Sequence, residues 1–212
     1  MMTVYVYGLD TMADWELGHV TAELHSGRFF KRDAQCVTLK TVSASGAPVK
    51  TMGGLTVMPD GTVDDIAVEK TGVLLLPGAN TWKDPKHGAV LDKAEQILAA
   101  GGMVCAICGA TVALAERGLL DHRRHTSNGP GFLEMMAPGY RGQGFYADSP
   151  SVADHGLITA GSTGGLLWAK QIIACLDVFA PDTLEAWYDY FSTGAPQAFF
   201  ALMDTLPSGM ET

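Results

Sequence analysis

The segment with the clearest capacity for chemistry is VCAICGAT at residues 104–111, which contains Cys108. An apolar run that predicts a buried strand ends at this cysteine, and a helical pattern begins directly after it. A nucleophile elbow has such a short strand-to-helix turn, and it requires small residues two positions before and two positions after the nucleophile. Ala106 and Ala110 occupy those positions. The pattern predicts that Cys108 is a cysteine nucleophile held at a tight turn.

The residues that follow Cys108 favour its thiolate form. Gly109 lets a ligand approach the backbone closely, and its N–H can donate to a developing oxyanion. The positive N-terminal end of the next helix stabilises a thiolate over a thiol. The competing interpretation is an ordinary buried cysteine, because free cysteine is among the most buried residue types. The strand–turn–helix context favours the reactive thiol.

The other three cysteines are assigned to the core. Cys105 and Cys108 form a C-x-x-C pair, but their Cα atoms would lie about 10 Å apart along a strand that rises ~3.3 Å per residue. A disulfide requires a separation below about 7 Å. Because Cys36 and Cys175 show no framework spacing either, we expect them in the core and expect no disulfide.

Strands and helices alternate along the chain on both sides of this turn. The predicted strands are 3–8, 34–41, 72–78, 103–107 and the start of 156–165, and residues 47–58 predict a hairpin excursion around Gly53-Gly54. The predicted helices are 14–26, 86–100, 109–118 and 166–179, followed by an aromatic helical region. The alternation predicts an α/β fold: a three-layer αβα sandwich of the flavodoxin-like type, with a mostly parallel central sheet and extra C-terminal helices.

The chain as a whole is predicted to be one domain. No linker, repeat or low-complexity segment divides residues 1–212, and about 181–212 form a helical C-terminal extension. The formal net charge of −9 repels phosphate backbones and anionic lipid, so neither nucleic acid nor a membrane is an expected partner. The N-terminal residues do not form a signal peptide, and the cysteine usage fits a reducing compartment, which predicts a cytoplasmic protein.

Four motifs together resemble the DJ-1/PfpI superfamily, within the broader class I glutamine amidotransferase-like fold. They are TMADWE at 11–16, LLLPGANTW at 74–82, AICGATVALAERGLLDHRRHTSN at 106–128 and ITAGSTGG at 158–165. The resemblance implies that Glu16 lies beside the Cys108 sulfur. It also implies an oxyanion hole formed by the backbone of Gly78 and Ala79, opposite Gly109. Members of the superfamily are commonly homodimers, so a homodimer is expected.

The chain departs from this family at one position that matters for catalysis. Many members carry a histidine near the cysteine where this sequence has Asn128, which can donate a hydrogen bond but cannot act as a base. His125 can replace that histidine only if the chain bends, since residues 125 and 128 of a strand face opposite sides; a packed or exposed histidine is the favoured interpretation. Without a Cys-His-Glu triad, glutamine amidotransferase activity is not expected.

The remaining candidate site residues rest on weaker sequence signals. Trp15 and Trp82 flank the two site loops and are candidates for the pocket wall, although both are equally compatible with the core. His122 and His125 have the spacing of a metal pair but lack nearby cysteine or carboxylate partners, so no metal is expected. The GSTGG run at 161–165 lacks the lysine of a phosphate loop and predicts a close-packing turn. No sequence motif indicates a cofactor.

Two functions remain open from the sequence. Cys108 and Glu16 suit an enzyme acting on small electrophiles of the aldehyde, dicarbonyl or acyl/amide type, such as a glyoxalase-like lyase or a hydrolase. The alternative is a cysteine-based oxidative-stress sensor or chaperone-like protein without turnover, because an accessible thiolate oxidises readily. A third interpretation is a degenerate scaffold that acts through dimerisation, with the aromatic C-terminal region as its interface.

Overall fold

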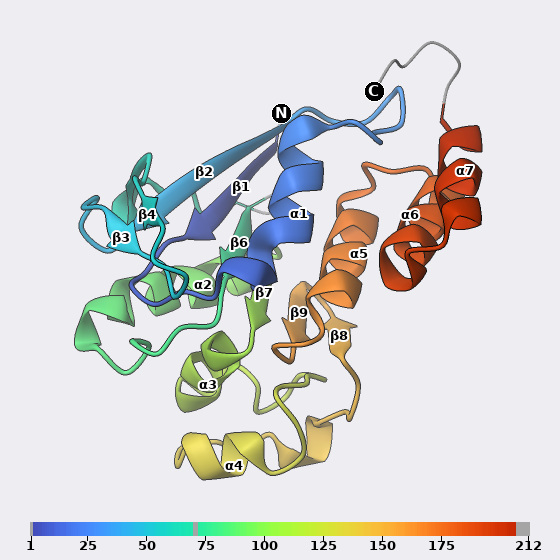
Figure 1. Ribbon diagram of the computed structural model, residues 1–212. Coiled ribbons are helices and arrows are strands. Elements are labelled where there is room, and N and C mark those ends of the chain that lie inside the picture. Colours follow the sequence, from blue (N-terminus) through green and yellow to red (C-terminus); the bar gives the residue numbers. More distant parts are fainter. Residues whose placement is uncertain (1, 70–71, 207–212) are drawn as a thin grey trace.

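The fold is built on a seven-stranded sheet in the order β5-β2-β1-β6-β7-β9-β8 (Figure 1). The structure is a computed structural model that describes residues 2–69 and 72–206. The strands of this sheet are β1 Met2–Tyr7, β2 Val37–Ser43, β5 Gly61–Thr62, β6 Val73–Leu76, β7 Met103–Ile107, β8 Ser151–Asp154 and β9 Leu157–Ala160. All neighbouring strands pair in parallel except β8 and β9.

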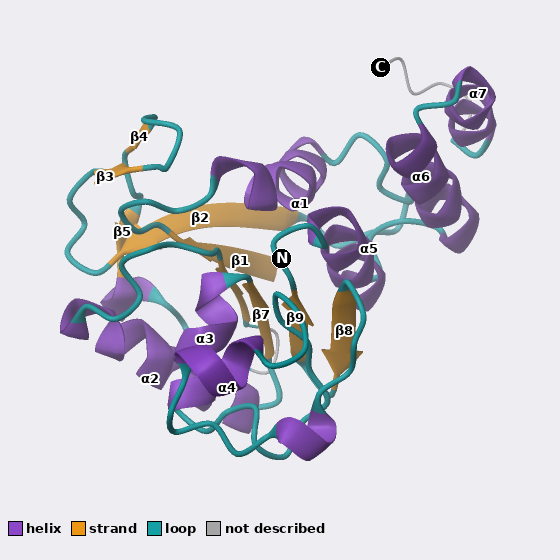
Figure 2. Cartoon of the chain, turned by 60° about the horizontal axis from the view of Figure 1, so that its bottom comes forward, coloured by secondary structure: helices purple, strands orange, loops and turns teal. Residues whose placement is uncertain are grey.

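Helices cover both faces of this sheet, as Figure 2 shows. The helices are α1 Asp14–Ser26, α2 Gly88–Ala99, α3 Gly109–Glu116, α4 Phe132–Met136, α5 Gly165–Leu176, α6 Pro181–Thr193 and α7 Pro196–Asp204, with 3-10 turns at Val63–Asp65, Pro85–His87 and Gln143–Phe145. Helices α1 and α5 pack against one face, and α2 and α3 pack against the other. The predicted three-layer αβα fold with a mostly parallel sheet is therefore confirmed.

The central strands are apolar along their whole length because both of their faces are covered. Every residue of β6 and all of β7 after Met103 are buried, together with all of β9. Because these three strands pair in parallel, their carboxyl ends lie at the same edge of the sheet, in the order β6, β7, β9. This edge positions the loops that carry Gly78, Cys108 and Ser162.

Several details differ from the sequence prediction. Strand β2 begins at Val37 rather than at residue 34, and β8 was not predicted because it is a short edge strand that ends in the exposed Ala153 and the half-buried Asp154. The excursion at 47–58 forms the two-stranded antiparallel pair β3 (Val49–Lys50) and β4 (Thr56–Val57) outside the main sheet.

In the part of the chain that is described, no helix combines the length and the apolar character needed to span a bilayer.

The assignment of two cysteines to the core is wrong. Cys105 is fully buried in β7, but Cys36 and Cys175 are both exposed. Cys36 directly precedes β2, whose residues 37–41 are themselves only partly buried or exposed. Cys175 lies on α5 away from the buried stripe that includes Ala169 and Ile172, so it faces outward.

The C-terminal helices are anchored to the body by a buried polar contact. Trp187 of α6 is fully buried, and its indole N–H donates to Glu23 Oε1 of α1 over 3.0 Å. Glu23 is also buried and accepts from Arg28 Nε over 2.8 Å. Helix α6 begins at Pro181, where the extension was predicted to start, and residues 207–212 of the predicted extension lie outside the described residues.

Candidate active site

Cys108 occupies the strand-to-helix turn that the sequence predicts. Strand β7 ends at Ile107, α3 begins at Gly109, and Cys108 between them has φ 56° and ψ −122°. A residue other than glycine is strained at such a positive φ, so the surrounding structure must hold this backbone conformation in place. The Cys108 N–H donates to the carbonyl of Ala160 over 2.9 Å, and the Thr111 hydroxyl donates to the Cys108 carbonyl over 2.6 Å. Both backbone groups of the nucleophile are thereby fixed.

Glu16 lies next to this cysteine, as the resemblance implied. It lies in the first turn of α1 and is only 1% exposed. The Gly78 N–H donates to Glu16 Oε2 over 2.6 Å, whereas Glu16 Oε1 is buried without a hydrogen-bond partner among the described residues. A Cβ at Gly78 would lie 2.7 Å from the Cys108 Cβ and 2.9 Å from each oxygen of the Glu16 carboxyl. Only glycine therefore allows these three segments to meet.

Asn128 donates a hydrogen bond to the nucleophile. Its Nδ2 lies 3.3 Å from the Cys108 Sγ, and its Oδ1 accepts from the Ser162 N–H over 2.9 Å. The Trp15 indole in turn donates to the Ser162 carbonyl over 3.3 Å. The turn at 161–165 thus fixes the orientation of the amide, so that its N–H face points at the sulfur. It also packs closely, because a Cβ at Gly161 would lie 2.7 Å from a backbone oxygen.

Sequence reasoning missed the role of Ser162. The contact uses its backbone N–H, so the side chain carries no signal of it. The available clue was topological: Ser162 follows β9, and the carboxyl end of β9 is adjacent to that of β7, where Cys108 lies.

His125 does not take the place of the family's histidine in this structure. It is fully buried, its Nε2 lies 2.6 Å from the Tyr140 hydroxyl, and its Nδ1 lies 2.6 Å from the Arg123 carbonyl oxygen. Both ring nitrogens are therefore engaged by groups other than the Cys108 sulfur. His122 packs edge-on against Phe145, and within residues 2–69 and 72–206 no group of side chains has the arrangement of a metal site.

A cavity of about 340 Å³ opens at the Cys108 sulfur. Glu16, Asn128, Ala79 and Gly109 line it beside Cys108, and Asn80 and Lys83 are its other polar lining residues. Because the Gly78 N–H donates to Glu16, the N–H groups of Ala79 and Gly109 are the predicted oxyanion donors that this carboxyl does not occupy. Gly109 packs directly on this loop, since a Cβ there would lie 3.0 Å from the Ala79 carbonyl oxygen.

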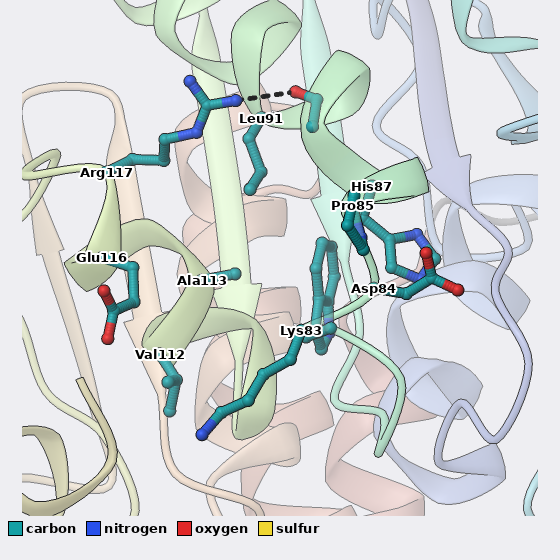
Figure 3. A pocket seen from close by; sticks show the side chains of 11 residues that line it. Lys83, Asp84, Pro85, His87, Leu91, Val112, Ala113, Glu116 and Arg117 are labelled. Atoms are coloured by element: carbon teal, nitrogen blue, oxygen red, sulfur yellow. Dashed lines mark hydrogen bonds between the residues drawn. The ribbon is translucent and has the colours of Figure 1, made fainter.

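Both predicted wall residues line the cavity, in different ways. Trp15 is 57% exposed at the rim, and Trp82 is buried with its indole N–H donating to the Pro77 carbonyl over 2.9 Å. Trp82 also borders a neighbouring cavity of about 460 Å³ between the Pro85–His87 turn and α3. Figure 3 shows this second cavity, with the Lys83 side chain extending toward Val112. Lys83 and Val112 line both cavities.

The sequence is similar to a known protein family and to a protein of Bacillus subtilis. A profile of the DJ-1/PfpI family matches residues 2–175. The chain belongs to the DJ-1/PfpI family. YoaZ of Bacillus subtilis (strain 168), which is called an uncharacterized protease, is 42% identical over 203 residues, which span 96% of this chain and 97% of YoaZ.

Solved structures of the family share the fold. A thiJ/pfpI family protein from Bacillus anthracis superimposes with a TM-score of 0.94 at 41% identity, over 97% of this chain and 98% of that protein. The DJ-1 superfamily protein Atu0886 from Agrobacterium tumefaciens superimposes with a TM-score of 0.77 at 28% identity, over 92% and 99% of the two chains. The resemblance inferred from the sequence motifs is therefore confirmed.

In this DJ-1/PfpI protein, burial governs the electrostatics of the Cys108–Glu16 pair. Burial raises the pKa of the Glu16 carboxyl, and the hydrogen bond from Gly78 opposes that rise. Burial also raises the pKa of the Cys108 thiol, against the effect of the Asn128 and Gly109 N–H groups, while a charge on Glu16 raises it further. The thiol pKa thus moves opposite to the lowering that the elbow alone predicts, because desolvation outweighs the donors.

The two groups titrate as a pair. A charge on one disfavours a charge on the other, so loss of one proton leaves a single negative charge to be shared between sulfur and carboxyl. The Asn128 and Gly109 N–H groups face the sulfur, whereas only the Gly78 N–H reaches the carboxyl. More N–H donors therefore face the sulfur than face the carboxyl, whereas burial and a charge on Glu16 oppose the thiolate.

Proposed function

We propose that this protein is a cysteine-dependent enzyme that forms a covalent adduct between Cys108 and a small electrophile of the aldehyde, dicarbonyl or acyl/amide type. One observation carries the proposal: the sulfur lies at a strained elbow inside a cavity, in contact with both an N–H donor, Asn128, and a buried carboxyl, Glu16. A nucleophile, a proton carrier and backbone donors are the parts that addition to a carbonyl requires.

The addition step uses one proton. The thiolate electron pair forms a bond to the carbonyl carbon, and the π electrons of the C=O bond move to oxygen. That oxygen accepts a hydrogen bond from the Ala79 N–H and one from the Gly109 N–H, which faces the thiolate before the addition and turns to the new charge once the sulfur has lost its own. The oxygen then takes the proton of the Glu16 carboxyl. The product is a hemithioacetal for an aldehyde, with Glu16 ionised, and charge and atoms are conserved.

Peptide or glutamine hydrolysis is less well supported. The relative YoaZ is called a protease, but amide cleavage requires a proton for the leaving nitrogen and a base for the attacking water. Asn128 supplies neither, and both nitrogens of His125 are engaged elsewhere. We therefore favour aldehyde and dicarbonyl chemistry of the glyoxalase-like kind, and we do not propose glutamine amidotransferase activity.

The replacement of a base by Asn128 supports a second candidate, an oxidative-stress sensor or chaperone-like protein without turnover. Here the thiolate attacks a peroxide oxygen, the S–O bond forms and the O–O bond breaks. The departing oxygen takes the Glu16 proton and leaves as water or alcohol. The resulting sulfenic acid oxidises further to sulfinic acid with a second peroxide.

Alkylation followed by turnover tests the two candidates. The rate of iodoacetamide alkylation is measured from pH 5 to pH 10 by intact mass, with Cys108→Ser as the control for the other cysteines. Because burial and an ionised Glu16 both raise this pKa, an apparent value for Cys108 clearly below the ordinary ~8.5 requires a protonated Glu16 that donates to the sulfur, and it supports a reactive thiolate. A value at or above ~8.5 contradicts both candidates. Turnover of methylglyoxal then supports the enzyme. Sulfinic acid at Cys108 after mild peroxide, without turnover, supports the sensor.

We also propose that the protein acts in the cytoplasm as a homodimer, with small molecules as its partners rather than nucleic acid or a membrane. The support is the family resemblance for the dimer and the net charge of −9 for the absence of polyanion binding. Light scattering is expected to give about twice the chain mass of 22.4 kDa. A monomer mass at micromolar concentration would contradict the dimer.

A further inference from the structure

The Cys108 cavity is lined mostly by apolar residues, with Glu16, Asn128, Asn80 and Lys83 as its polar side chains besides Cys108. Glu16 and Asn128 lie against the sulfur, and large apolar side chains supply much of the remaining wall and rim: Trp15, Met52, Trp82, Val112, Phe132 and Met136. These residues come from α1, the β3–β4 excursion, the loop after β6, α3 and α4. Several distant segments therefore contribute apolar surface to the same opening.

The rim exposes large apolar side chains to solvent. Trp15 is 57% exposed and Met52 is 47% exposed, and both line the cavity. Leu55 lies on the same excursion as Met52 and is also exposed, as is Met135 of α4. Clustered apolar side chains around a concave opening are typical of ligand sites, because a bound ligand removes them from water.

The cavity offers few charges to the part of a ligand that lies away from the sulfur. Among the described lining residues, the ionisable side chains are Glu16, Cys108 and Lys83, and the first two belong to the reacting end. Lys83 is exposed and lies where the two cavities meet. The remaining wall offers a ligand contact with aromatic rings and thioethers rather than ion pairs.

The cavity is too large for the smallest dicarbonyls to fill. About 340 Å³ corresponds to roughly eleven waters at ~30 Å³ each, so a three-carbon substrate leaves most of the apolar wall hydrated. We propose that this site selects electrophiles whose reactive carbon carries an aromatic or branched aliphatic group. The inference rests on the proposed function for the reaction at Cys108, and it adds the substrate class.

Paired alkylating agents test this selectivity separately from thiol activation. Iodoacetamide and N-phenyl iodoacetamide share one reaction: a bond forms from Sγ to the methylene carbon, and iodide leaves. The ratio of their rates at Cys108 is divided by the same ratio for N-acetylcysteine, which removes the intrinsic difference in reactivity. We expect a corrected preference of about tenfold or more for the phenyl compound, the scale on which apolar pockets discriminate.

Two methionines of the excursion provide a matched pair of variants. Met52→Gln keeps the length of the side chain but places an amide at the rim, and it is expected to lower the corrected preference about threefold or more. Met58→Gln is the control, because Met58 is 69% exposed and does not line the cavity. Its preference is expected to match that of the wild type.

The outcomes separate this inference from the proposed function. A corrected ratio near one, or equal effects of the two variants, overturns the selectivity. A high corrected ratio with an ordinary thiol pKa supports the selective cavity and contradicts the activated nucleophile. A ratio well below one shows that the rim is closed to such groups, for example by a second copy of the chain, and also overturns the inference.

Discussion

The Glu16→Gln variant distinguishes the two ways in which the pair can hold its charge. Glutamine has nearly the shape of a protonated glutamic acid. Its carbonyl oxygen can accept from the Gly78 N–H, as Oε2 does over 2.6 Å, and its NH₂ group can donate to the Cys108 sulfur. The variant therefore preserves the arrangement in which Glu16 keeps its proton, and it abolishes the arrangement in which Glu16 is ionised.

The expected change in the Cys108 pKa follows from Coulomb's law. Two unit charges about 4 Å apart interact with about 4 kcal/mol at an effective dielectric constant of ~20. At 1.36 kcal/mol per pKa unit, removal of an ionised Glu16 would lower the thiol pKa by about 3 units. If Glu16 is protonated and donates to the thiolate, the change removes no charge. The pKa of Cys108 is then expected to stay within about one unit of the wild-type value.

The assay is the pH dependence of iodoacetamide alkylation in wild type, Glu16→Gln and the exposed control Glu95→Gln. We expect similar pKa values for Cys108 in all three proteins. Turnover of aldehydes is expected to be lost in Glu16→Gln alone, because glutamine cannot release a proton to the adduct oxygen. A fall of two units or more in Glu16→Gln, absent from Glu95→Gln, would refute the assignment of the proton to Glu16.

Three further variants test the surroundings of the nucleophile and the anchoring of the C-terminal helices. Asn128→Ala removes the N–H that lies 3.3 Å from the sulfur, and it is expected to raise the alkylation pKa of Cys108 by about 1–2 units, since hydrogen bonds to charged groups contribute ~1.5–3 kcal/mol. Cys108→Gly is expected to be more stable than Cys108→Ala by about 1 kcal/mol in urea unfolding, because glycine tolerates φ 56°. A less stable glycine variant would show that the turn is not strained. Glu23→Ala leaves the Trp187 indole and the Arg28 guanidinium without their acceptor, and urea unfolding is expected to show a loss of about 2–3 kcal/mol; a loss below ~0.5 kcal/mol would contradict the anchoring role.

The elbow and the central strands were predictable because their signals are local. A continuous apolar run with a short strand-to-helix transition defines β7 and α3 without knowledge of the rest of the chain. Glu16 and Asn128 were placed near Cys108 only through the family motifs, since nothing in their own neighbourhoods indicates the cysteine. The exposed Cys36 and Cys175 show the limit of residue-type tendencies, because their burial depends on which side of an element faces the core.

Contacts made by backbone groups and by the tips of excursions were not predictable. The Gly78 N–H was expected to serve an oxyanion, but its direction depends on how α1 packs against the loop after β6. The excursion at 47–58 was correctly predicted as a hairpin. Its sequence does not show that the turn brings Met52 to the rim of the Cys108 cavity. That placement depends on long-range contacts such as the Met52 N–H donating to the Met12 carbonyl over 2.9 Å.

The apolar walls and the raised pKa of Glu16 have a common physical origin. Burial raises the pKa of the Glu16 carboxyl, and large apolar side chains line much of the open side of the cavity. An apolar substrate group that fills the opening removes water from this side. The charged carboxylate then loses further solvation, so the proton is held on Glu16 until the adduct oxygen develops its negative charge. A polar substrate that leaves the cavity wet would weaken this effect, so that selectivity for apolar electrophiles and retention of the catalytic proton depend on the same side chains.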